Sequence, residues 1–331
     1  MSAERSAMGW TVPSVDGLCL HIASTKEDAS ALAYSASGES IHLTQGLRSN
    51  GVVSAAQRVI AQRGLRHLSL IESIDFRGLA GRVRPLLYGA LLLRWRNRLE
   101  GVLAIGADTS AWLSRVAPAG LNVRPFAYFL AENSQPRYTS DGGLFRVLFV
   151  GALIPLKRVG LLLEVLGRLA EYPFAVDIVG DGPQRHELEE VAGRCLGGRV
   201  RFHGTQSIDG IASWMQRADC LVLPSAHDGW GAVISEALQA GTPVICSSAC
   251  GAKALVSASG KGGVFDKDDT AEFLDMMRIQ LDIGRVSIMD RQELSRWARC
   301  AGAQAGAKYL EELLVGAMVT PVLPPWEKGS L

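Results

Sequence analysis

Short apolar runs alternate with amphipathic segments along most of this chain of 331 residues. In the first half, the runs short enough for strands are 17–23, 40–46, 66–71, 101–105 and 123–126. Apolar residues at helical spacing predict helices over 52–63, 86–99 and 110–116. This alternation of strand and helix predicts a parallel sheet with helices on both faces.

The second half repeats the alternation with shorter strands that are almost wholly apolar. Its predicted strands are 145–150, 174–179, 200–203, 220–223 and 243–246. Its predicted helices are 157–170, 184–196, 208–218 and 232–240, with a long terminal helix over 291–314. Strands that are apolar on both faces are typical of parallel sheets covered on both sides.

A polar segment rich in Asn, Ser, Gln, Pro, Thr and Gly separates the two halves at 131–143. Such a composition predicts a linker between domains. We therefore expect a short N-terminal domain over 1–135, a linker over 136–143 and a C-terminal domain over 144–331. The fold class is α/β, with two Rossmann-like, doubly wound parallel-sheet domains facing a cleft.

Composition narrows the classes of function. Hydrophobic residues make up 48% of the chain, so a large core can be buried, and the net charge of +1 gives no global attraction to nucleic acid. The six cysteines form no C-x-x-C pair, so no metal site is expected from them. The longest uncharged apolar stretch, 85–93, is far below the ~18 residues that span a bilayer. Without a signal pattern, we expect a cytoplasmic protein, or one peripheral at the membrane.

The loop after the predicted strand 220–223 carries the most candidate chemistry. It reads Asp228-Gly229-Trp230-Gly231 and leads into a helix that bears Glu236 about one turn from its start. Glycines at a strand-to-helix turn let backbone N–H groups approach a ligand, and the helix N-terminus favours a phosphate. Carboxylates in these places can accept hydrogen bonds from the vicinal hydroxyls of a ribose or a sugar.

This stretch resembles the donor-site signature of the retaining GT-B glycosyltransferases, family 4 (glycosyl transferases group 1). The pattern is Pro-Ser, an acid, Gly-aromatic-Gly, then Glu-Ala, Ala-Gly, Pro-Val-Ile and Ser, with a Gly a few residues on, which is Gly251 here. The first acid is usually Glu in the family, whereas Asp228 is one methylene shorter. The resemblance implies that Glu236 holds the nucleotide ribose and that Asp228 contacts a hydroxyl of the transferred sugar. The backbone of 229–231 would lie beneath the sugar and diphosphate. A capped surface helix with incidental acids is the alternative, which the many matches at fixed spacing disfavour.

The stretch 149–158 resembles the same family, with Gly151 after a strand and Lys157 six residues later at a helix start. The resemblance implies that Lys157 pairs with the donor diphosphate and stabilises the leaving group. Ala152 stands where many members have an Arg, which leaves one cation fewer unless Arg158 or a residue of the first domain supplies it. An exposed lysine at a helix start is the alternative for Lys157.

Two glycine turns extend the resemblance. Gly180 and Gly182 match the Gly-x-Gly-Pro turn that lies beside the nucleotide base in the family, and Gly204 follows the next strand at a place where the backbone touches the base. A plain strand-to-helix turn would look the same. The pattern is no dinucleotide fingerprint, because a third glycine at the required spacing is missing.

The first half is less similar to the family. Many members place a His after the strand that ends here at Ile71, near the reacting sugar, and Glu72 occupies the corresponding loop. Glu72 is either a contact to the sugar or acceptor, or an acid on the rim.

Arginines flank the apolar run 85–93, at Arg82, Arg84, Arg94, Arg96 and Arg98. The segment is either an interfacial patch that reaches a lipid-linked acceptor at a membrane, or a helix with one buried face and solvated arginines. The second arrangement is the more common one.

Together, the resemblance implies retaining transfer of a sugar from a nucleotide diphospho-sugar to a hydroxyl of a glycan, lipid-linked or small-molecule acceptor. It implies the GT-B fold, a terminal helix that packs back on the N-terminal domain, and no metal or cofactor besides the donor. The alternative is a non-catalytic nucleotide-sugar binder or a partner subunit of a glycosyltransferase, motivated by Ala152 and the short first domain. A nicotinamide enzyme would need a Gly-x-Gly-x-x-Gly after a strand, and we find none.

Overall fold

The computed structural model describes residues 17, 19–47, 51–74, 76, 78–131, 143–316 and 322–328. The chain divides into a first unit, Met1–Ala127 with Leu310–Val322, and a second unit, Tyr128–Tyr309 with Leu323–Leu331. Within the described residues, the first unit holds a four-stranded sheet and the second a six-stranded sheet, both parallel. The predicted linker 136–143 lies outside the described residues except for Gly143.

The sheet of the second unit has the strand order β10-β9-β8-β5-β6-β7. Its strands are β5 (Phe145–Val150), β6 (Phe174–Val179), β7 (Val200–Phe202), β8 (Cys220–Leu223), β9 (Val244–Ser247) and β10 (Gly262–Phe265). Every residue of β8 and β9 is buried, as expected when helices cover both faces. The chain reverses its direction across the sheet between β5 and β8. The carboxyl ends of these two strands therefore form the switch point, where doubly wound sheets bind ligands.

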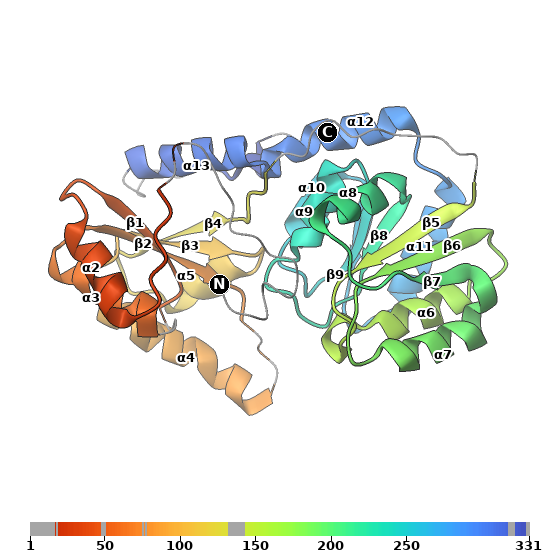
Figure 1. The fold of residues 1–331 in the computed structure, drawn as a ribbon, viewed down its shortest axis with the longest axis horizontal. Coiled ribbons are helices and arrows are strands. Elements are labelled where there is room, and N and C mark those ends of the chain that lie inside the picture. Colours follow the sequence, from red (N-terminus) through yellow and green to blue (C-terminus); the bar gives the residue numbers. More distant parts are fainter. Residues whose placement is uncertain are drawn as a thin grey trace. The chain divides into compact units, whose positions relative to one another are not determined.

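Helices cover both faces of this sheet. They are α6 (Val159–Gly167), α7 (Arg185–Leu196), α8 (Ile208–Arg217), α9 (Ala232–Gln239), α10 (Lys253–Ser259), α11 (Thr270–Ile283) and α12 (Ile288–Trp297). Figure 1 shows α6, α7 and α11 on one face and α8, α9 and α10 on the other. The short helix η1 (Pro155–Lys157) lies in the loop between β5 and α6. Because helices cover the sheet on both faces, the loops that leave the carboxyl ends of its strands are held on a rigid base.

In the first unit the strands pair in chain order, β1-β2-β3-β4. They are β1 (Ile41–Gln45), β2 (Arg66–Glu72), β3 (Gly101–Ile105) and β4 (Asn122–Phe126), and the helices are α2 (Lys26–Ser35), α3 (Gly51–Gln62), α4 (Gly78–Trp95) and α5 (Thr109–Val116). The core gathers around β3, where Val102 packs with Leu92 and Trp95 of α4 and Leu113 of α5. None of the helices in the described part of the chain is long and apolar enough to cross a membrane.

The N-terminal end of the first unit differs from the sequence prediction. A strand over 17–23 was wrong, because residues 19–24 form no strand and leave Leu20 and Ile22 more than half exposed. The helix α2 follows instead and was not predicted. Its start is a capping box, in which the Thr25 hydroxyl accepts from the Asp28 N–H (3.1 Å) and the Asp28 carboxylate accepts from the Thr25 N–H (3.0 Å).

Two other predicted helices also differ. The helix predicted from Leu86 begins earlier, at Gly78, and Pro85 lies inside it. The terminal helix predicted over 291–314 is broken into α12, the short helix η3 (Ala298–Ala301) and α13 (Ala303–Val315). The break is at Gly302, which has extended backbone because its neighbours bond to another segment: the Ala303 N–H donates to the Leu130 carbonyl (2.9 Å).

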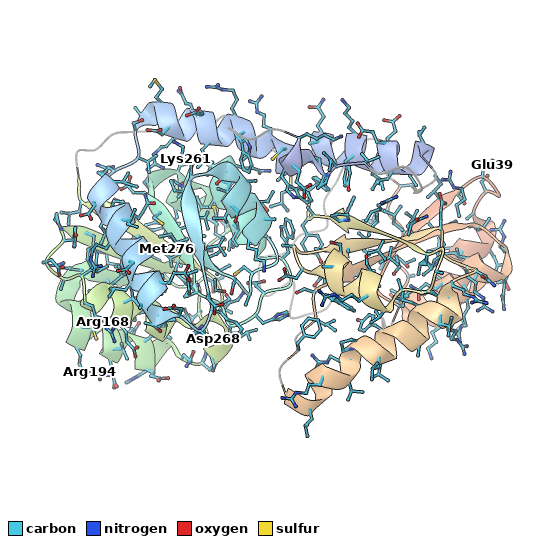
Figure 2. The ribbon with its side chains drawn as sticks, turned by 180° about the vertical axis from the view of Figure 1, so that it is seen from behind. Glu39, Arg168, Arg194, Lys261, Asp268 and Met276 are labelled. Atoms are coloured by element: carbon cyan, nitrogen blue, oxygen red, sulfur yellow. The ribbon has the colours of Figure 1, made fainter. Side chains whose placement is uncertain are left out.

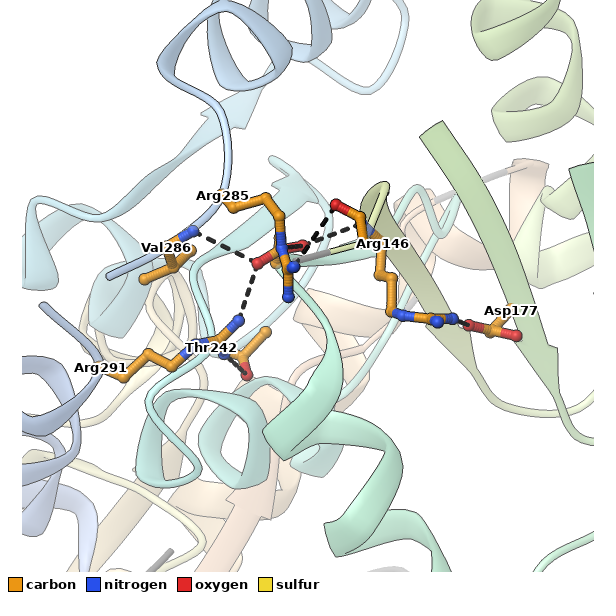
Figure 3. Close-up of polar contacts among 8 residues, drawn as sticks. Arg146, Asp177, Thr242, Arg285, Val286 and Arg291 are labelled. Atoms are coloured by element: carbon orange, nitrogen blue, oxygen red, sulfur yellow. Dashed lines mark hydrogen bonds and ion pairs between the residues drawn. The ribbon is translucent and has the colours of Figure 1, made fainter. Parts of the chain in front are cut away.

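A buried ionic network closes the amino edge of the second unit's sheet. Asp219, fully buried just before β8, accepts from the guanidinium of Arg291 (2.9 Å) and from that of Arg285 (3.3 Å). It also accepts from the backbone N–H groups of Arg146 (3.0 Å) and Val286 (3.3 Å). Figure 3 shows Arg285 and Arg291 reaching the same place, while the guanidinium of Arg146 reaches Asp177 instead. The network attaches the α11–α12 connection to the edge of the sheet opposite the switch point and compensates the buried carboxylate.

Candidate functional site

The loops that leave β5 and β8 meet at the switch point of the second unit. The Ala226 N–H donates to the Leu156 carbonyl (2.8 Å), which joins the two loops through their backbones. The ammonium of Lys157 lies 2.5 Å from a carboxylate oxygen of Asp228, and the two side chains are 21% and 15% exposed. The structure thus brings together two predicted site residues from separate stretches. They form an ion pair without net charge that is still accessible to a ligand.

A second segment supports the Asp228 loop from behind. The Gly251 N–H donates to the Asp228 carbonyl (3.0 Å), and the Ala252 N–H donates to the Trp230 carbonyl (2.8 Å). A Cβ on Gly251 would lie 2.0 Å from the Gly229 carbonyl oxygen, so this approach requires glycine. Sequence reasoning noted this glycine as part of the resemblance but did not see that it supports the loop.

Trp230 and Gly231 shape the start of α9. The Trp230 side chain is buried, and its indole N–H donates to the Ser235 hydroxyl (3.0 Å), so its ring is a packing element. Only the backbone of Trp230 is then free to contact a ligand. Gly231 is the residue before α9 and has a left-handed backbone conformation (φ 84°), which residues other than glycine rarely adopt. The helix therefore starts immediately after the loop, with its first N–H groups directed toward the loop.

Glu236 lies on the second turn of α9 and is largely enclosed. Burial raises the pKa of its carboxyl above the ordinary value. Among the residues that the structure describes, no side chain or backbone group bonds to this carboxyl. An acid that is desolvated and unpaired next to a ligand-binding edge is the kind of group expected where a ligand supplies the missing hydrogen bonds.

The predicted glycine turns pack against each other beside this pair of loops. The Gly180 N–H donates to the Gly204 carbonyl (2.8 Å). A Cβ on Gly180 would lie 2.0 Å from the Gly151 carbonyl oxygen, and one on Gly182 would lie 2.5 Å from that of Leu153. Close packing of the loops after β5, β6 and β7 therefore explains Gly180 and Gly182 without a ligand. The same packing gathers these glycines at one edge of the sheet.

Arg158 bonds to the loop that follows β10. It has a left-handed conformation (φ 53°), the only residue other than glycine with positive φ in the described ranges. Its guanidinium donates to the Lys267 carbonyl in the loop after β10 (2.5 Å). A role of Arg158 as the cation that is missing at Ala152 stays a prediction.

The comparison with known families covers these loops. Residues 131–285 match the family model described as glycosyl transferases group 1. The resemblance that the motifs around Asp228 and Lys157 predicted is confirmed.

Curated relatives carry related names. Over 184 residues the chain is 29% identical to the D-inositol 3-phosphate glycosyltransferase of Streptomyces avermitilis, covering 52% of this chain and 39% of the relative. Over 166 residues it is 30% identical to the alpha-D-kanosaminyltransferase of Streptomyces kanamyceticus, covering 49% and 41%. The chain thus spans less than half the length of these relatives.

Solved structures share the fold. Anabaena Alr3699/HepE in complex with UDP has a TM-score of 0.69 at 16% identity, over 88% of this chain and 82% of that one. The lipopolysaccharide outer core galactosyltransferase WaaB in its apo form has a TM-score of 0.67 at 16% identity, over 88% and 80%. The predicted fold class, two Rossmann-like parallel-sheet domains of the GT-B type, is confirmed.

Sequence reasoning missed one cation close to the glycine turns. Arg185, at the start of α7, pairs with Asp181 (3.1 Å) and Glu189 (2.9 Å). A Cβ on Gly204 would lie 3.5 Å from its guanidinium, so Arg185 lies beside the glycine turns. The signal was present in the sequence, since Arg185 follows the Gly180–Pro183 turn and has acids four residues away on both sides.

Glu72, the candidate from the first half, belongs to the first unit. It ends β2, and its carboxylate accepts a hydrogen bond from the Gln45 amide (3.1 Å). Its contact with a sugar or acceptor stays a prediction.

Proposed function

We propose that the chain transfers a sugar from a nucleotide diphospho-sugar to a hydroxyl of a glycan, lipid-linked or small-molecule acceptor, with retention at the anomeric carbon. The observation that carries this proposal is the Lys157–Asp228 pair at the switch point, followed by the unpaired Glu236 on α9. The names of the relatives, which transfer sugars, support the class of reaction. We further propose that it acts in the cytoplasm.

Each of the three side chains has a role in this proposal. The Lys157 ammonium leaves Asp228 to neutralise the donor diphosphate, and so stabilises the leaving group as the glycosidic bond breaks. Asp228, once released, accepts a hydrogen bond from a sugar hydroxyl. Glu236 accepts hydrogen bonds from the ribose hydroxyls, which offset the desolvation of its carboxylate.

The proposed chemistry needs little from the protein besides this donor site. Glycosyl transfer passes through an oxocarbenium-like transition state, so the main tasks are to stabilise the departing diphosphate and to orient the acceptor. In front-face attack the leaving phosphate accepts the proton of the acceptor hydroxyl. Neither a metal nor a separate general base is then required.

The donor is tested by thermal shift with UDP, GDP and ADP sugars, because a true ligand raises the melting temperature by mass action. UDP sugars come first, since HepE is a structural neighbour solved with UDP and with UDP-glucose. Each donor that shifts the melting point is then incubated with the protein, and release of free nucleotide is measured with and without acceptors. Stabilisation by no nucleotide sugar would contradict the proposal.

The second candidate is a non-catalytic nucleotide-sugar binder or partner subunit. It is favoured by one observation: Ala152 supplies no cation, and Arg158 is bonded to the Lys267 carbonyl. A donor that shifts the melting point but is neither hydrolysed nor transferred across a broad acceptor panel would favour this candidate.

A further inference from the structure

The helix α4 of the first unit is apolar on two opposite faces. Its inner face contributes Leu92 and Trp95 to the core around β3. On the outer face lie large apolar side chains that are about half exposed or more: Leu79 (82%), Val83 (49%), Leu86 (72%), Leu87 (50%) and Leu93 (54%). The outer face of a helix on a globular domain normally carries polar and charged residues. A contiguous apolar stripe in that place indicates a surface that another apolar phase covers.

The stripe is continuous along the helix. At about 100° per residue, Leu79, Val83, Leu86 and Leu93 fall within roughly 80° of arc on the helical wheel. Arg82 and Arg94 fall about 60° to either side of Leu79 on the same wheel. Both arginines are exposed, and within the described ranges neither forms an ion pair. The stripe is thus apolar in the middle and basic on both flanks.

Charge separates this helix from other exposed apolar positions of the chain. Between Phe76 and Leu99 the sequence has six arginines and no acidic residue. On α11, by contrast, the exposed Ile279 and Ile283 have the acids Asp275 and Asp282 within one turn. Positive charge without acids complements an anionic surface.

We propose that the outer face of α4 binds the surface of a bilayer that contains anionic lipids. The apolar stripe lies at the boundary between headgroups and acyl chains, and Arg82 and Arg94 pair with lipid phosphates. A second copy of the chain fits less well, because a self-complementary contact of this face would bring the same basic flanks opposite each other. The proposal goes beyond the donor site and does not depend on it.

Sedimentation of the full chain with lipid vesicles tests this proposal. Vesicles of equal parts phosphatidylglycerol and phosphatidylcholine are compared with vesicles of phosphatidylcholine alone. We expect binding to the anionic vesicles that high salt weakens, and much weaker binding to the neutral ones. The double variant Arg82→Glu/Arg94→Glu should lower the partition coefficient about 25-fold or more, since each arginine near an anionic surface contributes a factor of about five.

Matched controls lie on the second unit. Arg194, exposed on α7, points away from the domain (Figure 2), and Arg194→Glu should bind vesicles as the wild type does. Ile283→Ser removes an equally exposed apolar residue and should also have no effect, whereas Leu79→Ser/Leu86→Ser should weaken binding severalfold. Circular dichroism shows whether each variant is folded, and a second pair, Val83→Ser and Leu93→Ser, replaces any variant that is not.

Three results would overturn the proposal: equal binding to anionic and neutral vesicles, equal loss in the control variants, or no vesicle binding at all. Sedimentation velocity tests the alternative that a second copy of the chain binds the stripe. A dimer of the wild type that Leu79→Ser/Leu86→Ser abolishes would mean that a second copy covers the stripe. The thermal shift with donor is measured on the same variants, so that failure of vesicle binding is distinguished from failure of the donor site.

Discussion

The two units differ in how tightly their sequence is constrained. In the second unit, β8 and β9 are buried along their whole length, and glycines allow loop backbones to approach where any Cβ would collide. In the first unit, β3 is also buried along its whole length, but every residue of the edge strand β4 is only partly buried, and α4 exposes an apolar face. The family match, 131–285, covers the 131–143 segment and every strand of the second unit's sheet, and it covers no strand of the first unit. Loops held by close backbone contacts allow little variation in sequence, whereas the first unit has more freedom to change.

The largest expected effect tests the rigidity of the second unit. Asp219→Ala removes the carboxylate that compensates the buried guanidinium of Arg291, so we expect a loss of about 3–5 kcal/mol in the free energy of unfolding, measured by urea denaturation. The exposed pair of Asp275 with Arg278 is the control, and Asp275→Ala should cost less than about 1 kcal/mol. Equal losses in both variants would show that the buried network contributes no more to stability than an exposed ion pair.

The next effect concerns chemistry. Lys157→Ala should lower the rate of transfer about 100- to 1000-fold, because the leaving diphosphate loses its cation. Lys261→Ala, which removes a lysine paired with Asp290 far along the chain, should leave the rate unchanged. The assay is steady-state transfer with the donor found by thermal shift. A Lys157 variant with the wild-type rate would exclude the proposed role of this lysine at the diphosphate.

The first unit should be the more sensitive to acid. Burial lowers the pKa of His67 from 6.5 to about 4, so the folded state holds this imidazole neutral. This group therefore contributes stability above pH 6.5 that is lost as the pH falls through about 4, up to about 3 kcal/mol. His67→Leu should remove that part of the acid loss in urea melts, and His186→Leu, at an exposed site, should retain it. Identical pH profiles for the wild type and His67→Leu would contradict the assignment.

The smallest effect is a gain of stability at the donor site. The raised pKa of Glu236 means that its neutral form is favoured in the folded state, so its contribution is present at low pH and is lost as the pH rises through the raised pKa. At neutral pH, Glu236→Gln should therefore stabilise the ligand-free protein by about 1 kcal/mol. Glu187→Gln, on α7, is the control. Lower stability of Glu236→Gln in thermal melts would mean that Glu236 is paired within the protein.

Local motifs made much of the candidate site, which we propose binds the donor, predictable. Asp228, Glu236 and Lys157 stand in short stretches whose spacing is visible in the sequence, and so does the capping box of α2, although it was overlooked. What brings Lys157 to Asp228 is the strand order, which places β5 beside β8, and the sequence does not state it directly. The support of the Asp228 loop by Gly251 depends in the same way on contacts between separate segments.

The wrong predictions have the same origin. The alternation at 17–23 suggests a strand, but a strand also needs a neighbour to pair with, and residues 19–24 have none in the described part of the chain. Helical spacing over 291–314 continues through Gly302, but the bridge of this glycine to Leu130 takes the backbone out of the helix. Periodicity predicts local preference, and pairing with distant segments decides the rest.

The central claim is that the switch point of the second unit binds a nucleotide sugar. Isothermal titration calorimetry with the wild type, Glu236→Ala and Asp228→Ala tests it most directly. We predict that the wild type binds the nucleotide and that Glu236→Ala weakens this binding about tenfold or more, since it removes charge-assisted hydrogen bonds to the ribose. Asp228→Ala should bind the nucleotide nearly as well and mainly lose transfer. Equal nucleotide affinity in the wild type and Glu236→Ala, with full activity in both variants, would contradict the account.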